Sequence, residues 1–242
     1  EYAEVHIVEA GSLKNIKLFE GLSADALSSI EQDCKWYQCN ISEQLIDRHS
    51  TDLDLYFLLS GKARVVNYSL TGREVSFDDK GPGDYFGELG AIDGQPRSAN
   101  VIALEDMLVA RLSRSDFMEI ISQQPSITLK ILHGLAKIVR ISNNRIMDLS
   151  TVGANNRVHA EILRLVELGE VSENTAVVCP IPIHGDIASR VSTTRETVNR
   201  VFSDLTRKGL IKRNKNELLV LDISRLKRMV ELVRGETGDN EI

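Results

Sequence analysis

The sequence predicts an α+β chain in three consecutive parts: a β-roll, a long central helix and a winged helix-turn-helix. Residues 36–112 hold short runs rich in Val, Ile, Tyr and Phe, separated by Gly, Asp and Asn, which is typical of a β-barrel or roll. Apolar residues at alternating spacings of three and four follow from residue 132. Near the C-terminus, two helical patterns with a tight connection precede a basic hairpin. We place the three parts at residues 1–115, 116–152 and 153–242.

The predicted roll begins with short helical pieces over residues 13–34, where Ser23 is a candidate N-cap. The apolar run at residues 55–59 ends at Ser60-Gly61 and reads as a strand followed by a turn. Pro82-Gly83 is a further turn signal.

The predicted central helix opens near Ser115, and Pro125 would kink or restart it. Its regular part could be a helix packed on its own domain or the seam of a two-stranded coiled coil. The strict alternation of three and four favours a parallel seam and therefore a homodimer. The residues of this row are Leu132, Leu135, Val139, Ser142, Ile146 and Leu149.

The C-terminal part is expected to begin with a hinge at residues 153–156 and a helix over residues 157–168. Two helices, at about residues 185–190 and 194–208, flank a very short connection. Thr193 and Glu196 have the spacing of a capping box, and Gly209 is placed to end the second helix. Residues 210–213 and 218–221 then read as the basic hairpin of a wing.

Composition excludes several classes of protein. The 242 residues are 42% hydrophobic and contain no apolar run long enough to span a membrane. Residues 1–5 carry neither a basic nor an apolar signal segment, so no signal peptide is expected. Cys34 and Cys39 could be a metal pair, but no further ligands complete four, so we expect no metal site. With Cys179 they read as ordinary thiols of a reducing cytoplasm.

The charge is unevenly distributed along the chain. The net charge of −6 by itself argues against binding to nucleic acid. However, residues 1–120 carry 21 Asp and Glu against 11 Lys and Arg, whereas residues 190–215 carry eight Lys and Arg against two acidic residues. Affinity for phosphates depends on the local field, so one basic segment on an acidic body suits a protein that docks DNA by one end.

The first set of candidate functional residues lies between Phe86 and Ala99. Glycines free backbone N–H groups toward an anion, and Arg97 can grip phosphate oxygens in a fork with Ser98 adding a hydroxyl. Glu88 can accept from a sugar hydroxyl. The set would fit a nucleotide with one phosphate, although a surface turn with an ion pair would have the same residues.

The second set runs from Thr194 to Arg200 on the second of the two paired helices. Arg195 and Arg200 are natural partners of guanine, and Glu196 can accept from cytosine. Thr194 and Thr197 are better suited to phosphate, as are Lys212 and Lys215 in the wing. A solvated helix surface with an internal ion pair is the alternative, but the tight turn and the basic wing favour binding to double-stranded DNA.

The run from Gly87 to Ala99 resembles the phosphate-binding cassette of cyclic-nucleotide-binding domains. With the winged helix behind it, the chain from Leu18 to Val233 resembles the catabolite activator protein family of bacterial transcription regulators. The resemblance implies that Glu88 accepts from the ribose 2′-hydroxyl, that Arg97 and Ser98 hold the cyclic phosphate, and that RNA polymerase is a further partner. The ligand site it implies comprises Gly87, Glu88, Leu89, Arg97, Ser98, Ala99, Ser142 and Asn143.

The resemblance leaves the choice of nucleotide open. Ser142 and Asn143 would contact the base, and both side chains can donate or accept, so either cAMP or cGMP could bind. The family itself suggests cAMP alone. One departure is Ile138, which stands where the family has an arginine on the central helix, so the support of Glu88 is expected to differ. The resemblance also implies a palindromic operator with TGTGA-like half-sites.

Other classes explain less of the sequence. A cyclic-nucleotide module that controls a kinase or channel would leave residues 183–221 without a purpose. An enzyme finds no support, because the sequence shows no Ser-His-acid order and no P-loop. An iron–sulfur sensor would need four cysteine ligands, and haem or organic-acid sensors of the family usually lack the Glu88 and Arg97-Ser98 set.

Overall fold

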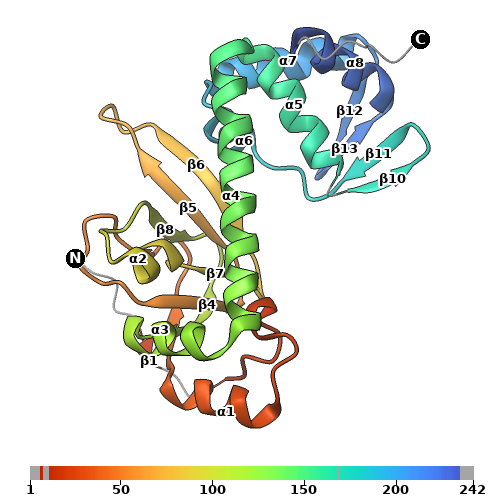
Figure 1. The fold of residues 1–242 in the computed structure, drawn as a ribbon. Coiled ribbons are helices and arrows are strands. Elements are labelled where there is room, and N and C mark those ends of the chain that lie inside the picture. The colour runs from red at the N-terminus through yellow and green to blue at the C-terminus, as the bar shows by residue number, and fades with distance from the viewer. Residues whose placement is uncertain (1–5, 8–10, 168, 235–242) are drawn as a thin grey trace, which may run out of the picture. The chain divides into compact units, whose positions relative to one another are not determined.

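The computed structural model of the protein describes residues 6–7, 11–167 and 169–234 (Figure 1). It confirms the predicted class: a β-rich N-terminal part, a long central helix and a C-terminal helix-turn-helix part. The chain divides into two compact units, residues 1–138 and 139–242, and each is described by itself. The division falls inside the long helix, so our boundaries at residues 115 and 152 stay a prediction. Residues 1–5, on which the signal-peptide expectation rested, lie outside the described residues.

The N-terminal unit is built on two antiparallel sheets. The first has the strand order β1-β2-β9-β4-β7 and the second has the order β3-β8-β5-β6. The strands of the first sheet are β1 (His6–Ile7), β2 (Lys35–Cys39), β4 (Leu55–Ser60), β7 (Tyr85–Phe86) and β9 (Met107–Leu112). Those of the second are β3 (Gln44–Ile46), β5 (Ala63–Tyr68), β6 (Glu74–Lys80) and β8 (Asn100–Ala103).

The first sheet is covered on both faces, and strand β4 shows why its sequence is apolar without interruption. Successive side chains of a strand point to opposite faces. Leu55 and Phe57 lie in the cluster that the helices complete, whereas Tyr56 and Leu58 lie in the cluster between the two sheets. All four are buried, so the strand has no polar face.

Short helices surround the sheets of this unit. They are η1 (Lys17–Phe19), α1 (Ala24–Asp33), α2 (Glu88–Asp93) and α3 (Arg114–Gln123). The predicted cap is confirmed, since the Ser23 hydroxyl accepts from the backbone N–H of Ala26. Helix α4 (Pro125–Thr151) starts directly after Gln124, so Pro125 restarts the helical chain rather than kinking one helix.

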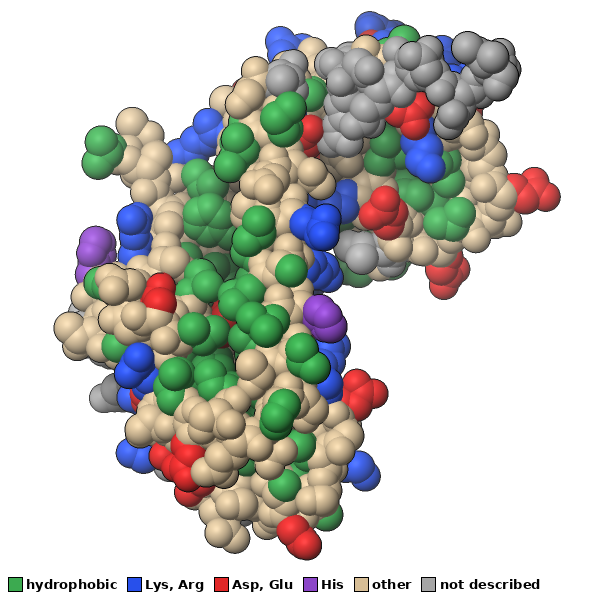
Figure 2. Space-filling model, viewed as in Figure 1, with side chains coloured by type: hydrophobic (Ala, Val, Ile, Leu, Met, Phe, Trp, Pro, Cys, Tyr) green, Lys and Arg blue, Asp and Glu red, His purple; other side chains and the backbone are tan. Residues whose placement is uncertain are grey.

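The first turns of helix α4 pack within the N-terminal unit. Ile127 and Ile131 are buried in the helix-covered cluster, and Leu135 packs against it. A Cβ at Gly134 would lie 2.8 Å from the Tyr85 hydroxyl oxygen, so glycine permits this close approach. Other apolar side chains along the helix are exposed, and hydrophobic residues gather along α4 in Figure 2. The more than half-exposed ones are Leu129, Leu132, Val139, Ile146 and Met147.

The C-terminal unit combines four helices with a four-stranded antiparallel sheet around one core. The helices are α5 (Ala154–Val166), α6 (His184–Arg190), α7 (Arg195–Arg207) and α8 (Ile223–Arg234). The strands β10 (Glu170–Ser172), β11 (Thr175–Val178), β12 (Ile211–Asn214) and β13 (Glu217–Val220) pair in the order β10-β11-β13-β12. The paired helices and the hairpin β12–β13 confirm the predicted winged helix-turn-helix.

Two local predictions in this unit are wrong. Residues 154–156 are not a hinge but the first turn of α5, so only Val152 and Gly153 separate α4 from α5. The capping box of Thr193 and Glu196 is not formed: Thr194 is the N-cap of α7, so Thr197 stands at the third helical position, and its N–H donates to the Thr194 hydroxyl. Thr193 is buried instead, which removes it from the capping position. The last residue of the predicted helix, Leu168, lies outside the described residues.

Candidate functional site

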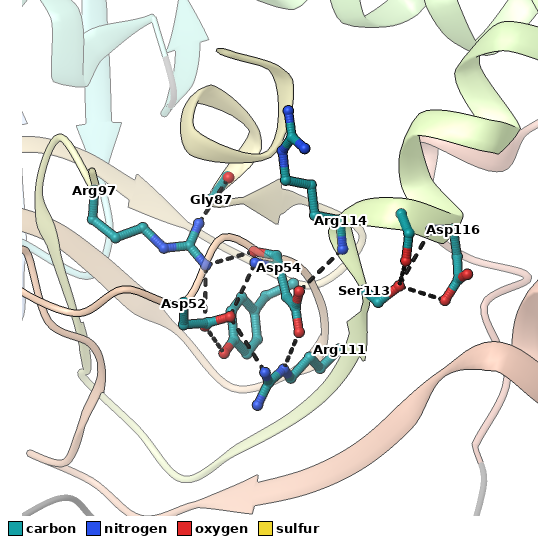
Figure 3. Close-up of polar contacts among 10 residues, drawn as sticks. Asp52, Asp54, Gly87, Arg97, Arg111, Ser113, Arg114 and Asp116 are labelled. Atoms are coloured by element: carbon teal, nitrogen blue, oxygen red, sulfur yellow. Dashed lines mark hydrogen bonds and ion pairs between the residues drawn. The ribbon is translucent and has the colours of Figure 1, made fainter. Parts of the chain in front are cut away.

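Arg97 is the buried centre of the first predicted site (Figure 3). Only 4% of the residue is exposed. Its Nη1 donates to the carbonyl of Gly87 at 2.9 Å. Its Nη2 donates to the carbonyl of Asp54 at 2.7 Å and to the Asp52 carboxylate at 3.1 Å. The fork that we expected to face a phosphate is therefore engaged with protein oxygens, because a buried guanidinium must be hydrogen-bonded.

Two aspartates before strand β4 hold Arg97 in a network with Arg111 of β9. Asp52 accepts from the Tyr56 hydroxyl at 2.7 Å and from Arg111 Nη2 at 3.3 Å. Asp54 accepts from Arg111 Nε at 2.6 Å. The other Asp54 oxygen accepts from the backbone N–H of Arg114 at 3.0 Å, which connects the network to the first residue of α3.

Gly87 is required at its position by two separate constraints. Its φ of +87° lies in the left-handed region that side chains disfavour. A Cβ there would lie 2.7 Å from Arg97 Nη1 and 3.0 Å from the carbonyl oxygen of Asp54. The glycine therefore makes room for the guanidinium and for its hydrogen bond to the Gly87 carbonyl.

The remaining cassette residues lie around Arg97 on α2 and the segment leading into β8. Glu88, the first residue of α2, is partly buried, and burial raises the pKa of its carboxyl despite the nearby Lys80. Ser98 is exposed, and its carbonyl accepts from the Asn67 side chain at 3.0 Å. Leu89 is exposed and Ala99 is buried.

Arg97 also has one donor without a partner. Its Nε is buried and, like the Nε of Arg114, forms no hydrogen bond among the described residues. Buried donors are normally paired, so an oxygen ligand that reached this N–H would be stabilised. A phosphate oxygen would supply both an acceptor and a negative charge.

Ser142 and Asn143 lie on α4, within the second compact unit, and both are exposed. Their expected contact with a base stays a prediction.

The second predicted site lies on α7 and its cap. Thr194, Arg195, Glu196 and Arg200 are exposed, whereas Val198, Val201, Phe202 and Leu205 are buried in the core. The hydrogen bonds from its own backbone N–H and from the Thr194 hydroxyl lower the pKa of Glu196. Arg200 Nη2 donates to Asn155 of α5 at 3.4 Å. The polar face of α7 is thus exposed to solvent along its N-terminal half, where a recognition helix meets base edges.

Arg157 of α5 fixes the turn that precedes α7. Its Nε donates to the carbonyl of Val191 at 2.9 Å and its Nη2 to that of Ser192 at 3.1 Å. Its Nη1 donates to the carbonyl of Val152, directly after α4, at 2.8 Å. One side chain therefore joins the end of α4 to the helix-turn-helix turn.

Sequence reasoning missed Asp52, Asp54 and Arg111. The signal was present, since two carboxylates spaced two residues apart directly precede a fully apolar strand. Tyr56 lies 4 residues after Asp52, but the arginine partners follow 43 to 60 residues later, so only the fold brings these together.

Comparisons with known proteins match one family of domains to the N-terminal part of the chain and another to the C-terminal part. The family model for the Cyclic nucleotide-binding domain matches residues 43–124, and that for the Crp-like helix-turn-helix domain matches residues 156–229. The chain is 26% identical over 212 residues to the CRP-like cAMP-activated global transcriptional regulator of Mycobacterium tuberculosis, covering 87% of this chain and 95% of that protein. It is 28% identical to the Cyclic AMP receptor protein of Thermus thermophilus, covering 83% and 90%.

A solved structure shows the same fold. A mutant of CooA from Carboxydothermus hydrogenoformans superposes with a TM-score of 0.76 at 18% identity, covering 93% of this chain and 98% of that chain. Within the described part of our chain, no helix is long and apolar enough to cross a membrane. The same part holds no group of three or more His, Cys, Asp or Glu residues that could bind a metal ion.

The network predicts a specific pH dependence of stability. Although burial alone would raise it, the pKa of Asp52 is held below its ordinary value by hydrogen bonds from Tyr56 and the Asp54 backbone and by the charges of Arg111 and Arg97. Such a carboxyl adds stability above its unfolded pKa of about 3.9, and this contribution is lost as the pH falls through the lower folded value. We therefore expect Asp52→Asn to cost about 1–3 kcal/mol near neutral pH and progressively less below about pH 4.

Thermal unfolding of the wild type and of Asp52→Asn at several pH values measures the difference in their free energies of unfolding. Glu105→Gln, at an exposed carboxylate, is the control. A difference in unfolding free energy between the two proteins that stayed constant down to about pH 2.5 would show that the Asp52 charge does not stabilise the network.

Proposed function

Because this chain belongs to the CRP/FNR family of transcription regulators, we propose that cAMP, cGMP or both bind at Arg97 and control its binding to a palindromic operator. The chain is a cyclic-nucleotide-responsive, DNA-binding regulator and not an enzyme. Our proposal concerns which nucleotide binds, which operator is recognised and how the chain forms a dimer. The observation that carries it is the buried Arg97 guanidinium, with one unpaired donor, inside the matched nucleotide-binding domain.

The proposed role of Arg97 follows from its present partners. The cyclic phosphate carries one negative charge and competes with the Asp52 carboxylate for the guanidinium, while Asp52 keeps its bonds to Tyr56 and Arg111. Ser98 is exposed beside it and supplies a hydroxyl donor. Glu88 accepts from the ribose 2′-hydroxyl. The Mycobacterium tuberculosis and Thermus thermophilus relatives are named for cAMP, which supports a cyclic nucleotide here as well.

Arg97→Ala should lower the affinity for cAMP by roughly 100-fold or more, because each charge-assisted hydrogen bond contributes about 1.5–3 kcal/mol. Arg97→Lys keeps the charge but loses the fork, so it should bind at an intermediate affinity. Calorimetric titration measures both, and thermal unfolding checks that each variant is folded. Unchanged cAMP affinity in Arg97→Ala would place the ligand elsewhere.

We further propose that both nucleotides bind within roughly tenfold of each other, about 1.4 kcal/mol. Glu88, Arg97 and Ser98 would contact only the ribose and phosphate, which cAMP and cGMP share. Ser142 and Asn143 offer groups without fixed polarity toward the base. Titration with cAMP and with cGMP tests this, and Asn143→Ala should change the ratio of the two affinities more than their mean. A thousandfold preference of the wild type for cAMP would refute the dual-ligand proposal.

The proposed operator contact uses the free face of α7. Arg195, Glu196 and Arg200 would read a G·C-containing half-site of TGTGA type, with Thr194, Thr197, Lys212 and Lys215 toward the phosphates. In a two-fold dimer the half-sites are centred about one helical turn, roughly 34–36 Å, apart. We infer from family membership that the bound protein works in the cytoplasm and contacts RNA polymerase.

Arg200→Ala should cost about 1–3 kcal/mol of affinity for the operator and relax discrimination at one base pair. Arg207→Ala is the matched control, because Arg207 lies at the opposite end of the same helix and is exposed. Anisotropy titrations with operator and mixed-sequence duplexes measure the difference. An equal loss of affinity for both duplexes would mean that Arg200 contacts phosphate only.

The exposed apolar row of α4 is the proposed dimer seam. Leu132, Val139 and Ile146 are each more than half exposed, which is unfavourable unless a second copy covers them. The double variant Leu132→Asp, Ile146→Asp should therefore be monomeric in sedimentation. Leu135 is left unchanged because it packs on the core of the N-terminal unit. Leu232→Asp, at an exposed leucine of α8, is the control, and a double variant that stays dimeric would exclude this seam.

A further inference from the structure

Strand β12 of the wing places its basic residues on opposite faces. Ile211 and Arg213 share one face by the alternation of a strand, and Ile211 is buried in the core that contains α6 and α7. Leu218, the partner of Arg213 across the hairpin, is buried in the same core. Lys212 and its partner Leu219 lie on the other face. Arg213 is thus on the side of the sheet that bears the helices, and Lys212 is not.

His184, the first residue of α6, holds Arg213 at this place. Arg213 Nη1 and His184 Nε2 lie 3.4 Å apart. A guanidinium can only donate, so Nε2 is the acceptor of this contact. Nδ1 of the same ring is hydrogen-bonded to the side-chain oxygen of Asn199 on α7. The ring also lies against Phe202, with 4.6 Å between ring centroids.

Arg213 remains available to an anion. It is exposed and, among the described residues, forms no ion pair with a carboxylate. Its one hydrogen bond to the imidazole leaves most of its N–H groups available to an anion. Asn199 precedes Arg200 and lies one helical turn after Arg195, so the chain of contacts ends beside the polar face of α7.

We propose that Arg213 is a further contact of the wing with a DNA backbone phosphate, beside Lys212 and Lys215, and that His184 is the positioning residue that aims it. The proposal rests on the DNA-binding function of the C-terminal unit but not on the sequence of the operator. A guanidinium fixed by His184 loses less conformational freedom on binding than the free side chain of Lys212. The phosphate contact is independent of base sequence, so any duplex reports it.

The test uses the full chain and a mixed-sequence duplex, titrated at several KCl concentrations. The logarithm of the binding constant falls with the logarithm of salt concentration by about 0.9 for each phosphate neutralised. Arg213→Ala should flatten this slope by about 0.9 per protomer. Lys227→Ala is the matched control, since it removes the same charge from an exposed residue of α8, outside the helix-turn-helix and the wing, and its slope should equal that of the wild type. Equal flattening by both variants, or no flattening by Arg213→Ala, would overturn the assignment.

The positioning role of His184 has its own readout. His184→Ala should weaken binding, and the double variant His184→Ala, Arg213→Ala should bind no more weakly than Arg213→Ala. His184→Gln can still donate to Asn199 or accept from Arg213 and should restore part of the affinity. If His184→Ala lowered the affinity for the duplex equally in the wild type and in Arg213→Ala, the histidine would act independently of Arg213. A wild type that bound the duplex without salt dependence would instead contradict phosphate binding by the whole unit.

Discussion

Burying the guanidinium of Arg97 is the constraint around which the N-terminal unit is arranged. A charged side chain that leaves water must find oxygen acceptors inside the fold, or the cost is several kcal/mol. Asp52, the Asp54 carbonyl and the Gly87 carbonyl supply them from two separate segments. Gly87 has no side chain because that volume is taken by the guanidinium. The acceptors present satisfy two of the three nitrogens, and Nε remains without a partner.

This arrangement connects the proposed ligand site to helix α3. Asp54 accepts from Arg97 through its carbonyl and from the first N–H of α3 through its carboxylate. Helix α3 is separated from α4 by Gln124 alone, and α4 continues into the second unit. A ligand that draws Arg97 away from Asp54 therefore changes a contact of α3. Such a change shifts an equilibrium only to the extent that the ligand binds the two arrangements differently.

At the other end of α4, the C-terminal unit has its own mechanical link. Arg157 donates to the carbonyl directly after α4 and to two carbonyls of the helix-turn-helix turn. The connection between α4 and α5 is only Val152 and Gly153, and Val152 is buried. A movement of α4 is thus expected to displace the turn that positions α7. Each link contains an arginine side chain bonded to a backbone carbonyl, and the first also contains the backbone N–H of Arg114 donated to the Asp54 carboxylate.

The sequence predicted those features that depend on local pattern. The apolar spacing located α4, and the paired helices followed by a basic hairpin located the winged helix-turn-helix. The sequence did not predict which of two adjacent threonines caps α7, because threonine is a good N-cap at either position. In the structure Thr193 is buried and Thr194 is the N-cap. The sequence also did not predict contacts between residues far apart in the chain. Arg97 is hydrogen-bonded to residues 43 and 45 positions away, and His184 contacts Arg213, which is 29 positions away. A lone histidine at the start of a short helix gives no such signal.

The central claim is that occupation of the Arg97 site and binding of DNA by α7 are energetically coupled. Linkage requires that the coupling act equally in both directions. The most direct measurement is the dissociation constant of cAMP for the full chain, by calorimetry, with and without saturating operator duplex. The account predicts that the duplex tightens cAMP binding by about 5–150-fold. Equal affinities with and without the duplex would contradict it.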